Sequence, residues 1–346
     1  MRKRISAIIM TLFMVLVSCN SGGVAEDPKH VYLASIANLG KGFLDVFVTF
    51  GDMVTGAFGI KADTKKSDIG KYFTDIESTM TTVKKKLQDE VAKNGNYVKV
   101  KTVVDKFITD TLDKIASGAK EAAKGATTDV VIGNAKQNED AVAAEAASVN
   151  SLVKGIKEIV GVVLKENEGD AGTTKTKDEQ QKSIGKLLGG KDNGGAEAQA
   201  AAASASIGAV SGADILQAIA KSAEAIGEPT IQAAKNAAEI AVAKKEDNKD
   251  LGVSAQKDAV IAAGIALRAM AKDGKFAAKT GEEKSAHAVN GAAASAVGKT
   301  LSTLIIAIRN TVDSGLKTIN EALAAVKQED KSVKATNTAE VTTDGQ

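Results

Sequence analysis

Cys19 is the only cysteine of the 346-residue chain, and the residues before it follow a recognisable order. Residues 1–4, MRKR, are cationic, residues 5–17 are mostly apolar, and Ser18 stands directly before the cysteine. The apolar stretch is too short to cross a bilayer, so residues 1–18 are predicted to be a secretory signal rather than a membrane-spanning helix. A thiolate at the end of such a signal can be alkylated near neutral pH, where a serine hydroxyl cannot.

The residues Leu16-Val17-Ser18-Cys19 resemble the bacterial lipobox. That motif implies a diacylglyceryl group on the Cys19 sulfur, cleavage between Ser18 and Cys19, and acylation of the new amine. Two or three acyl chains make a stable anchor, because each buried methylene adds about 0.8 kcal/mol. The alternative is an ordinary signal peptide that happens to contain a cysteine, but no competing A-x-A cleavage site is present.

Two short segments match the phosphate-binding loop pattern loosely. Residues 293–300 read AASAVGKT, and residues 185–191 read GKLLGGK, followed by Asp192 where a hydroxyl should bind magnesium. A working loop of this kind needs a buried strand before it and a helix after it. The first match lies in an alanine-rich helical run and the second in a polar stretch, so neither predicts a nucleotide site.

The remaining polar residues give no signature of catalysis or metal binding. His30 and His287 are far apart and lack the spacing of a zinc site, and no G-x-S-x-G motif is present. His30 is expected to be exposed at the start of the first helix and His287 to lie on a polar turn. We therefore expect no catalytic residue, no cofactor, no metal and no enzyme activity. Lys84, Lys85 and Lys86 form a basic run that most simply reads as a solvated helix face, with an anionic host ligand or a lipid headgroup as the alternative.

Composition predicts an almost wholly helical body. The chain has two prolines and 3% aromatic residues, and it is rich in alanine. Removing residues 1–18 lowers Lys+Arg from 45 to 42 against 43 Asp+Glu, which leaves a net charge of −1. A nearly neutral chain without a basic field argues against nucleic-acid binding. No other segment is expected to span a membrane.

Apolar residues at spacings of three and four predict a series of helices. The second helix should open with Ser67 as its N-cap. Four helices should each bury one apolar face. The predicted faces are Ile69, Phe73, Ile76, Met80, Val83, Leu87 and Val91 on the second helix; Val100, Val104, Phe107, Thr111 and Ile115 on the third; Val142, Val149, Leu152, Ile156, Ile159 and Val163 on the fourth; and Val297, Leu301, Leu304, Ile308, Val312, Ile319, Leu323 and Val326 on the last. A break at residues 94–96 should make the second and third helices an antiparallel pair. The predicted helices cover residues 31–60, 67–93, 97–123, 139–166, 204–243 with a break near 227–229, 255–271 and 288–327.

The chain therefore divides into four predicted parts. Residues 1–18 are the signal, residues 19–30 a lipidated flexible tether, residues 31–327 a helical domain, and residues 328–346 a frayed tail. Three polar segments interrupt the helical domain and read as loops that carry little core. These loops are residues 169–200, 244–251 and 272–284.

Several long motifs resemble those of one family. GDMV at 51–54, TKKSDIGKYF at 64–73 and LDKIASGAKEAA at 112–123 are similar to the N-terminal half of the variable large proteins of Borrelia spirochaetes. This chain is also similar to the C-terminal half of those proteins, through the motifs GADILQAI at 212–219, AGIALRAMAKDGKF at 263–276 and LIIAIR at 304–309. The resemblance covers nearly the whole chain, and the polar insertions depart from it most.

The resemblance implies an outer-membrane surface lipoprotein used for antigenic variation. One member of a silent repertoire would be expressed at a time, and switching would evade host antibody. It also implies an elongated all-α helical bundle whose first and last helices lie near the membrane, with the polar loops outermost. Such a family has no known catalytic residue, so Cys19 is the only functional position that the resemblance carries over.

Three classes of function remain open at this point. An antigenically variable coat protein would have the outer membrane and host antibodies as its partners. An adhesin for a host protein or glycan would need a fixed exposed patch, such as the face around residues 84–86. An enzyme or nucleotide-binding protein is the third class. The sequence does not decide whether the body forms a homodimer through its apolar helices.

Overall fold

The computed structural model describes residues 34–35, 37–42, 59–94 and 97–326. The predicted signal, Cys19 with its tether, most of the predicted helix over 31–60 and the tail over 328–346 lie outside these residues. The described part of the chain is helical, and its extended pairing consists of isolated β-bridges only. The all-α prediction is therefore confirmed.

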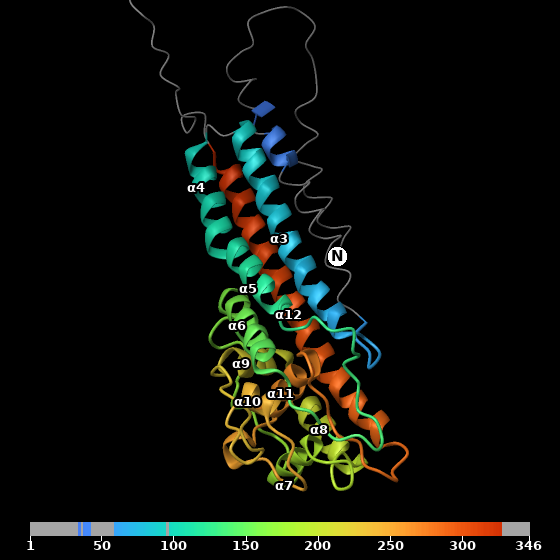
Figure 1. Cartoon of the computed structure of the whole chain (residues 1–346). Coiled ribbons are helices and arrows are strands. Elements are labelled where there is room, and N and C mark those ends of the chain that lie inside the picture. The colour runs from blue at the N-terminus through green and yellow to red at the C-terminus, as the bar shows by residue number, and fades with distance from the viewer. Residues whose placement is uncertain (1–33, 36, 43–58, 95–96, 327–346) are drawn as a thin grey trace, which may run out of the picture.

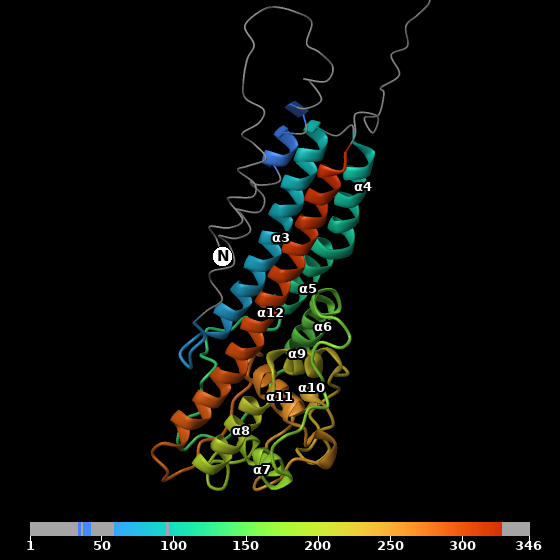
Figure 2. The same cartoon turned by 180° about the vertical axis from the view of Figure 1, so that it is seen from behind.

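Three long helical rods lie side by side in both views of the molecule (Figures 1 and 2). The first is α3, the second is α4 continuing through a π-helical turn, η2, into α5, and the third is α12. We call these rods the stem. Their bounds are α3 Lys66–Asn94, α4 Val98–Phe107, η2 Ile108–Leu112, α5 Asp113–Ala123 and α12 Ser285–Ala324.

Residues 124–284, which we call the head, pack around the N-terminal part of α12 at the end of the molecule away from α4 (Figure 1). Residues 37–42 lie at the other end, where a Cβ on Gly40 would be 3.5 Å from Leu323 Cδ2 of α12. The helices of the head are α6 Ala146–Val163, α7 Asp178–Ser183, η3 Ile184–Leu188, α8 Glu197–Ala209, α9 Gly212–Ala220, α10 Ala237–Val242, η4 Val253–Ala255 and α11 Asp258–Met270.

The apolar stripes of α3 and α12 form the core of the stem, as the sequence predicts. All seven stripe residues of α3 are buried, and along α12 the stripe is buried from Val297 to Leu323. The start of α3 differs from the prediction, because the helix begins at Lys66. Ser67 therefore lies in its first turn and its hydroxyl donates to Asp129 Oδ1 at 2.6 Å instead of capping the helix.

The π-helical turn shifts the buried face of the second rod. The predicted stripe placed Thr111 on that face, but Thr111 is only partly buried. A π-turn adds one residue to a helical turn, so the residues after it are rotated relative to a regular α-helix. Ile108 and Leu112 occupy the buried positions instead, and Ile115 continues the face.

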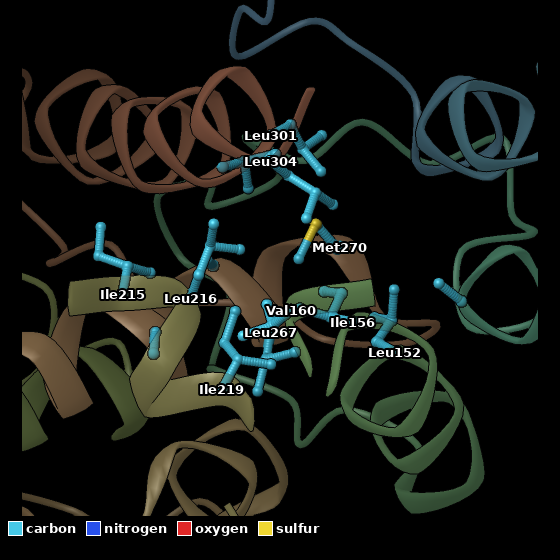
Figure 3. Packing of buried hydrophobic residues seen from close by; sticks show 14 of the residues in the cluster. Leu152, Ile156, Val160, Ile215, Leu216, Ile219, Leu267, Met270, Leu301 and Leu304 are labelled. Carbon is cyan, nitrogen blue, oxygen red and sulfur yellow. The ribbon is translucent and has the colours of Figure 1, made fainter. Parts of the chain in front are cut away.

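The core of the head is built around α11, in which every residue is buried. Figure 3 shows Leu267 and Met270 of α11 meeting apolar side chains from three other helices. These side chains are Leu152, Ile156 and Val160 of α6, Ile215, Leu216 and Ile219 of α9, and Leu301 and Leu304 of α12. One hydrophobic core therefore joins the head to the stem through α12.

Glycine lets α5 and α6 approach closely where they cross. A Cβ on Gly155 would lie 2.3 Å from Gly118 O, and a Cβ on Gly118 would lie 2.6 Å from Gly155 O. Both distances are shorter than any tolerable contact, so this crossing requires a hydrogen atom in place of each side chain.

Two predicted helices are shorter in the structure than in the prediction. The helix predicted over 139–166 begins only at Ala146, and Val142, placed on its buried face, is an exposed large apolar residue paired with Lys275 in an isolated bridge. The helix predicted over 204–243 is divided into α8, α9 and α10. The break predicted near residues 227–229 is present, but it extends over residues 221–236, and the break between α8 and α9 was not predicted.

By length and composition α12 could cross a membrane, contrary to the expectation that no segment besides the signal would. However, 56% of its most apolar 18-residue window is buried inside the molecule. Its apolar face is already used by α4, α8, α9 and α11. We therefore interpret α12 as the core helix of the fold.

Candidate functional surface

Only some of the residues that the sequence analysis considered as site candidates lie within the described structure. Ser18, Cys19 and His30 lie outside the described residues. His287 lies in the first turn of α12 and is exposed, although the sequence placed it on a polar turn. Among the described residues, no three His, Cys, Asp or Glu side chains are grouped closely enough to hold a metal ion.

The two phosphate-loop patterns have structural roles. Residues 293–300 lie inside α12, where the Thr300 hydroxyl is buried and donates to Ala296 O at 2.7 Å. The Lys299 ammonium donates to Ile207 O at 2.8 Å and so ties α12 to α8. The second pattern spans η3 and a turn in which Gly194 N donates to Gly190 O at 2.7 Å. Neither segment presents a row of free main-chain N–H groups to a phosphate.

The lysine run on α3 is divided between two environments. Lys84 Nζ lies 2.7 Å from Asp113 Oδ1 and joins α3 to α5, whereas the side chain of Lys85 is exposed. Partly exposed ion pairs of this kind contribute little to stability. The arrangement favours a solvated helix face over a single cationic patch.

The three predicted loops all belong to the head, but each of them contributes buried apolar residues to the hydrophobic core. Residues 169–200 contain α7, η3 and the start of α8, and they bury Ile184, Leu187 and Leu188. The segment 272–284 buries Phe276, Ala277 and Ala278, and the segment 244–251 buries Leu251. The prediction that these segments carry little core is wrong. Apolar residues spaced irregularly between polar ones gave no periodic signal.

A buried carboxylate holds part of the first polar segment. Asp258, the first residue of α11, is fully buried and accepts hydrogen bonds from Lys175 N at 2.5 Å, Thr176 N at 2.8 Å and Thr176 Oγ1 at 2.5 Å. Burial alone would raise the pKa of Asp258, but these hydrogen bonds to the ionised form outweigh it and hold the pKa below its usual value. Ala259 N also donates to Thr173 O at 3.2 Å.

A second carboxylate holds the same segment nearer to α6. Asp214 of α9 accepts from Asp170 N at 2.7 Å through Oδ1 and from Ser211 N at 2.7 Å through Oδ2, so it joins the segment to its own helix start. Gln217 Nε2 donates to Glu168 O at 3.2 Å. Gly169 passes against Ala213 with φ of 86°, a conformation that side chains rarely adopt.

Two buried cations lie where the stem meets the head. Lys66 Nζ donates to Ala271 O at 2.5 Å and Gly274 O at 2.7 Å. Arg268 donates to Ala241 O, Ala243 O and Lys275 O, each at 3.0 Å, and its Cζ lies 5.8 Å from the ring centroid of Phe276. Both side chains are fully buried.

The electrostatic cost of these two cations is visible in their pKa values. Burial, and secondly the neighbouring charge of Arg268, lower the pKa of Lys66 to about 7. Burial lowers the pKa of Arg268 to about 9. The pair therefore holds main-chain carbonyls of the head in place against a desolvation penalty.

Sequence reasoning did not single out these residues, although part of the signal is readable. Ser211 and Asp214 form a capping box at the start of α9, which is a recognisable S-x-x-D spacing. Arg268 is one basic residue in an otherwise apolar stretch of α11, which marks a buried cation that needs partners. Those partners come from other elements, so no local pattern names them.

The chain matches known proteins along nearly its whole length. The family model described as Borrelia lipoprotein matches residues 43–323. Variable large protein 4 of Borrelia hermsii is 72% identical over 362 residues and covers 100% of both chains. Variable large protein 17 of the same organism is 73% identical and covers 100% of this chain and 99% of its own.

A solved structure has the same fold. The crystal structure of the Lyme disease variable surface antigen VlsE of Borrelia burgdorferi is similar to this chain with a TM-score of 0.75 and 36% sequence identity. The alignment covers 84% of this chain and 98% of that one. The likeness therefore extends over both stem and head.

Proposed function

The chain belongs to the Borrelia lipoprotein family, and from this membership we propose that it is a surface coat protein whose antigenic variation evades host antibody. The observation that carries the proposal is the full-length likeness to variable large proteins of Borrelia hermsii. The fold is compatible with display, because the stem separates the head from the end where the N-terminal residues 37–42 lie (Figure 1). Exposed side chains of the head are then the surface that antibody meets and variation changes.

The test follows one clonal population that expresses this protein. The population is grown in antibody-competent hosts and in hosts that lack antibody, and the expressed locus is sequenced over successive waves. We expect this variant to disappear only where antibody is present. Equal persistence in both kinds of host would contradict the proposal and would turn attention to binding of a host molecule.

The anchor is part of the same proposal. Cys19 would carry the S-diacylglycerol and N-acyl groups and hold the protein on the outer membrane, facing outward. We expect Cys19→Ser to abolish incorporation of labelled palmitate and to release the protein from the membrane fraction, because one acyl-bearing residue supplies the attachment. Ser21→Ala, two residues further along the tether, should keep both. Undiminished palmitate labelling of the Cys19→Ser protein would exclude this residue as the lipid site.

Surface exposure has its own measurement. Protease added to intact cells should remove the head of the wild-type protein while a periplasmic marker stays whole. Protection of the head in intact cells would contradict an outward-facing anchor.

A further inference from the structure

Three asparagines of the chain are followed directly by glycine, at positions 94, 193 and 290. In such a pair the next main-chain nitrogen can attack the side-chain carboxamide, because glycine has no Cβ that hinders the approach. Asn94 is the last residue of α3, and the glycine after it lies outside the described residues. The structure places the other two asparagines in opposite environments.

Asn290 lies near the start of α12, and its carboxamide is bonded at both ends. Ala135 N donates to Asn290 Oδ1 at 2.9 Å, and Asn290 Nδ2 donates to Ala135 O at 3.1 Å. Gly291 belongs to the same helix, in which main-chain N–H groups donate to the preceding turn. Reaction at Asn290 would therefore break both the helix and the tie between α12 and the head, so the folded protein protects this pair.

Asn193 lies in the turn that joins η3 to α8, residues 189–195, which we call the glycine turn. Its side chain is exposed and makes no hydrogen bond to any described residue. The attacking atom is restrained by the hydrogen bond from Gly194 N to Gly190 O at 2.7 Å. That bond belongs to the turn itself and not to a helix, so local opening of the turn is enough to free Gly194 N.

The packing of the head requires glycine after Asn193. A Cβ on Gly194 would overlap with Lys186 O, and a Cβ on Gly195 would overlap with Ala277 O. Gly195 also has a φ of 71°, a conformation that side chains rarely adopt. The residue that makes Asn193 reactive is therefore fixed by the fold, and a larger residue there would have to move main-chain atoms.

The glycine turn is bound to a neighbouring part of the head through main-chain atoms. Thr280 N donates to Lys191 O at 2.9 Å, and Lys279 N donates to Gly195 O at 3.2 Å. Asn193 lies between these two acceptors in the sequence. An extra main-chain atom at Asn193 would change their separation, so the two hydrogen bonds could no longer form together.

We propose that Asn193 is a site of spontaneous deamidation, and that its isoaspartyl product loosens the contact of the glycine turn with residues 279–280. Gly194 N bonds to Asn193 Cγ, the Cγ–Nδ2 bond breaks, and ammonia leaves with the proton of Gly194 N. Water then opens the cyclic imide at either carbonyl. One product is aspartate on the original main chain. The other is isoaspartate, in which the main chain passes through Cβ and Cγ and is one carbon longer.

The first test compares two asparagines of one molecule. The folded mature protein is incubated at neutral pH and physiological temperature, and the conversion of each asparagine is followed by peptide mapping with mass spectrometry. We expect Asn193 to convert at least tenfold faster than Asn290, with isoaspartate among its products. In guanidinium chloride both should convert at similar rates, and Asn193 faster than in the folded protein, because the bond of Gly194 N is then open. Equal conversion of the two asparagines in the folded protein would overturn the proposal.

The second test separates the added charge from the longer main chain. In the isoaspartyl fraction of aged protein, the amides of Lys279 and Thr280 should exchange hydrogen at least tenfold faster than in fresh protein. Asn193→Asp carries the same charge on a normal main chain and should exchange as fresh protein does. Asn193→Gln, incubated in parallel, should show neither conversion nor faster exchange. Unchanged exchange in the isoaspartyl fraction, or equal acceleration in Asn193→Asp, would contradict loosening by the longer main chain.

Discussion

Arg268→Leu is expected to destabilise the protein by about 2 kcal/mol. The guanidinium is fully buried and donates to three main-chain carbonyls at 3.0 Å. Leucine restores the apolar volume but leaves Ala243 O without its donor, which costs about 1–3 kcal/mol, whereas Ala241 O and Lys275 O keep the main-chain donors Ala144 N and Val142 N. Relief of the burial cost of the cation offsets part of the loss, since Nη2 has no hydrogen-bond partner within the described structure.

Urea denaturation followed by circular dichroism at pH 7 measures this effect. Arg309→Leu is the matched control, because Arg309 is an exposed arginine of α12 whose contact with Asp313 is an i,i+4 ion pair. We expect that control to change the free energy of unfolding by less than about 0.5 kcal/mol. A loss below about 1 kcal/mol in Arg268→Leu would show that the carbonyl of Ala243 finds another donor.

Lys66 is expected to make the stability of the protein rise with pH above neutrality. Its pKa is about 7 in the folded protein against an ordinary lysine value of 10.5, so folding favours the neutral amine. Below pH 7 the amine is charged in both states and the penalty of burying the charge is constant. Between pH 7 and pH 10.5 the unfolded state binds more protons, so the free energy of unfolding increases by up to about 1.4 kcal/mol per pH unit.

The groups that act on Lys66 set the conditions of this measurement. Arg268 lowers the pKa of Lys66 and Asp273 raises it, and Arg268, with a pKa of about 9, itself begins to lose its proton towards pH 8.5. Urea denaturation at about pH 7.0, 7.4 and 7.8, below that range, should therefore report mainly on Lys66. In Lys66→Met the slope should vanish, whereas Lys85→Met, an exposed lysine of the same helix, should keep it. A slope that survives in Lys66→Met would assign the pH dependence to other groups.

The long helices α3 and α12 could be predicted from the sequence because the apolar residues of their buried faces recur at helical spacing. The stripes of α3 and α12 extend over many turns, so no local irregularity hides the period. The regions that were predicted as helix but are not helical lack such a repeating buried face. Residues 139–145 and 221–236 contain helix-favouring alanine, yet their main-chain groups bind partners distant in sequence, such as Ala241 O for Ala144 N and Glu246 Oε2 for Ile231 N. Tertiary contacts override propensity there.

The candidate functional residues also include some that the sequence identifies and some that it does not. The lipobox can be read because its chemistry needs four adjacent residues, and it remains a prediction. The hydrogen bonds that hold residues 170–176 against α9 and α11 cannot be predicted, because Asp258 is 83 residues from Lys175 and the polar composition of both neighbourhoods only suggests loops. Several of these bonds are made by main-chain N–H groups, which every residue except proline has, so the sequence carries no pattern that marks them.

The unbroken length of α12 has a consequence for how such molecules would stand together. Its 40 residues rise about 60 Å from the head to the far end of the stem. If neighbouring molecules are anchored side by side, this single helix sets the thickness of the layer, and crowding shields the stems from anything as bulky as an immunoglobulin. Selection by antibody would then be concentrated on the outermost few turns, and the stem below would be free to keep its sequence.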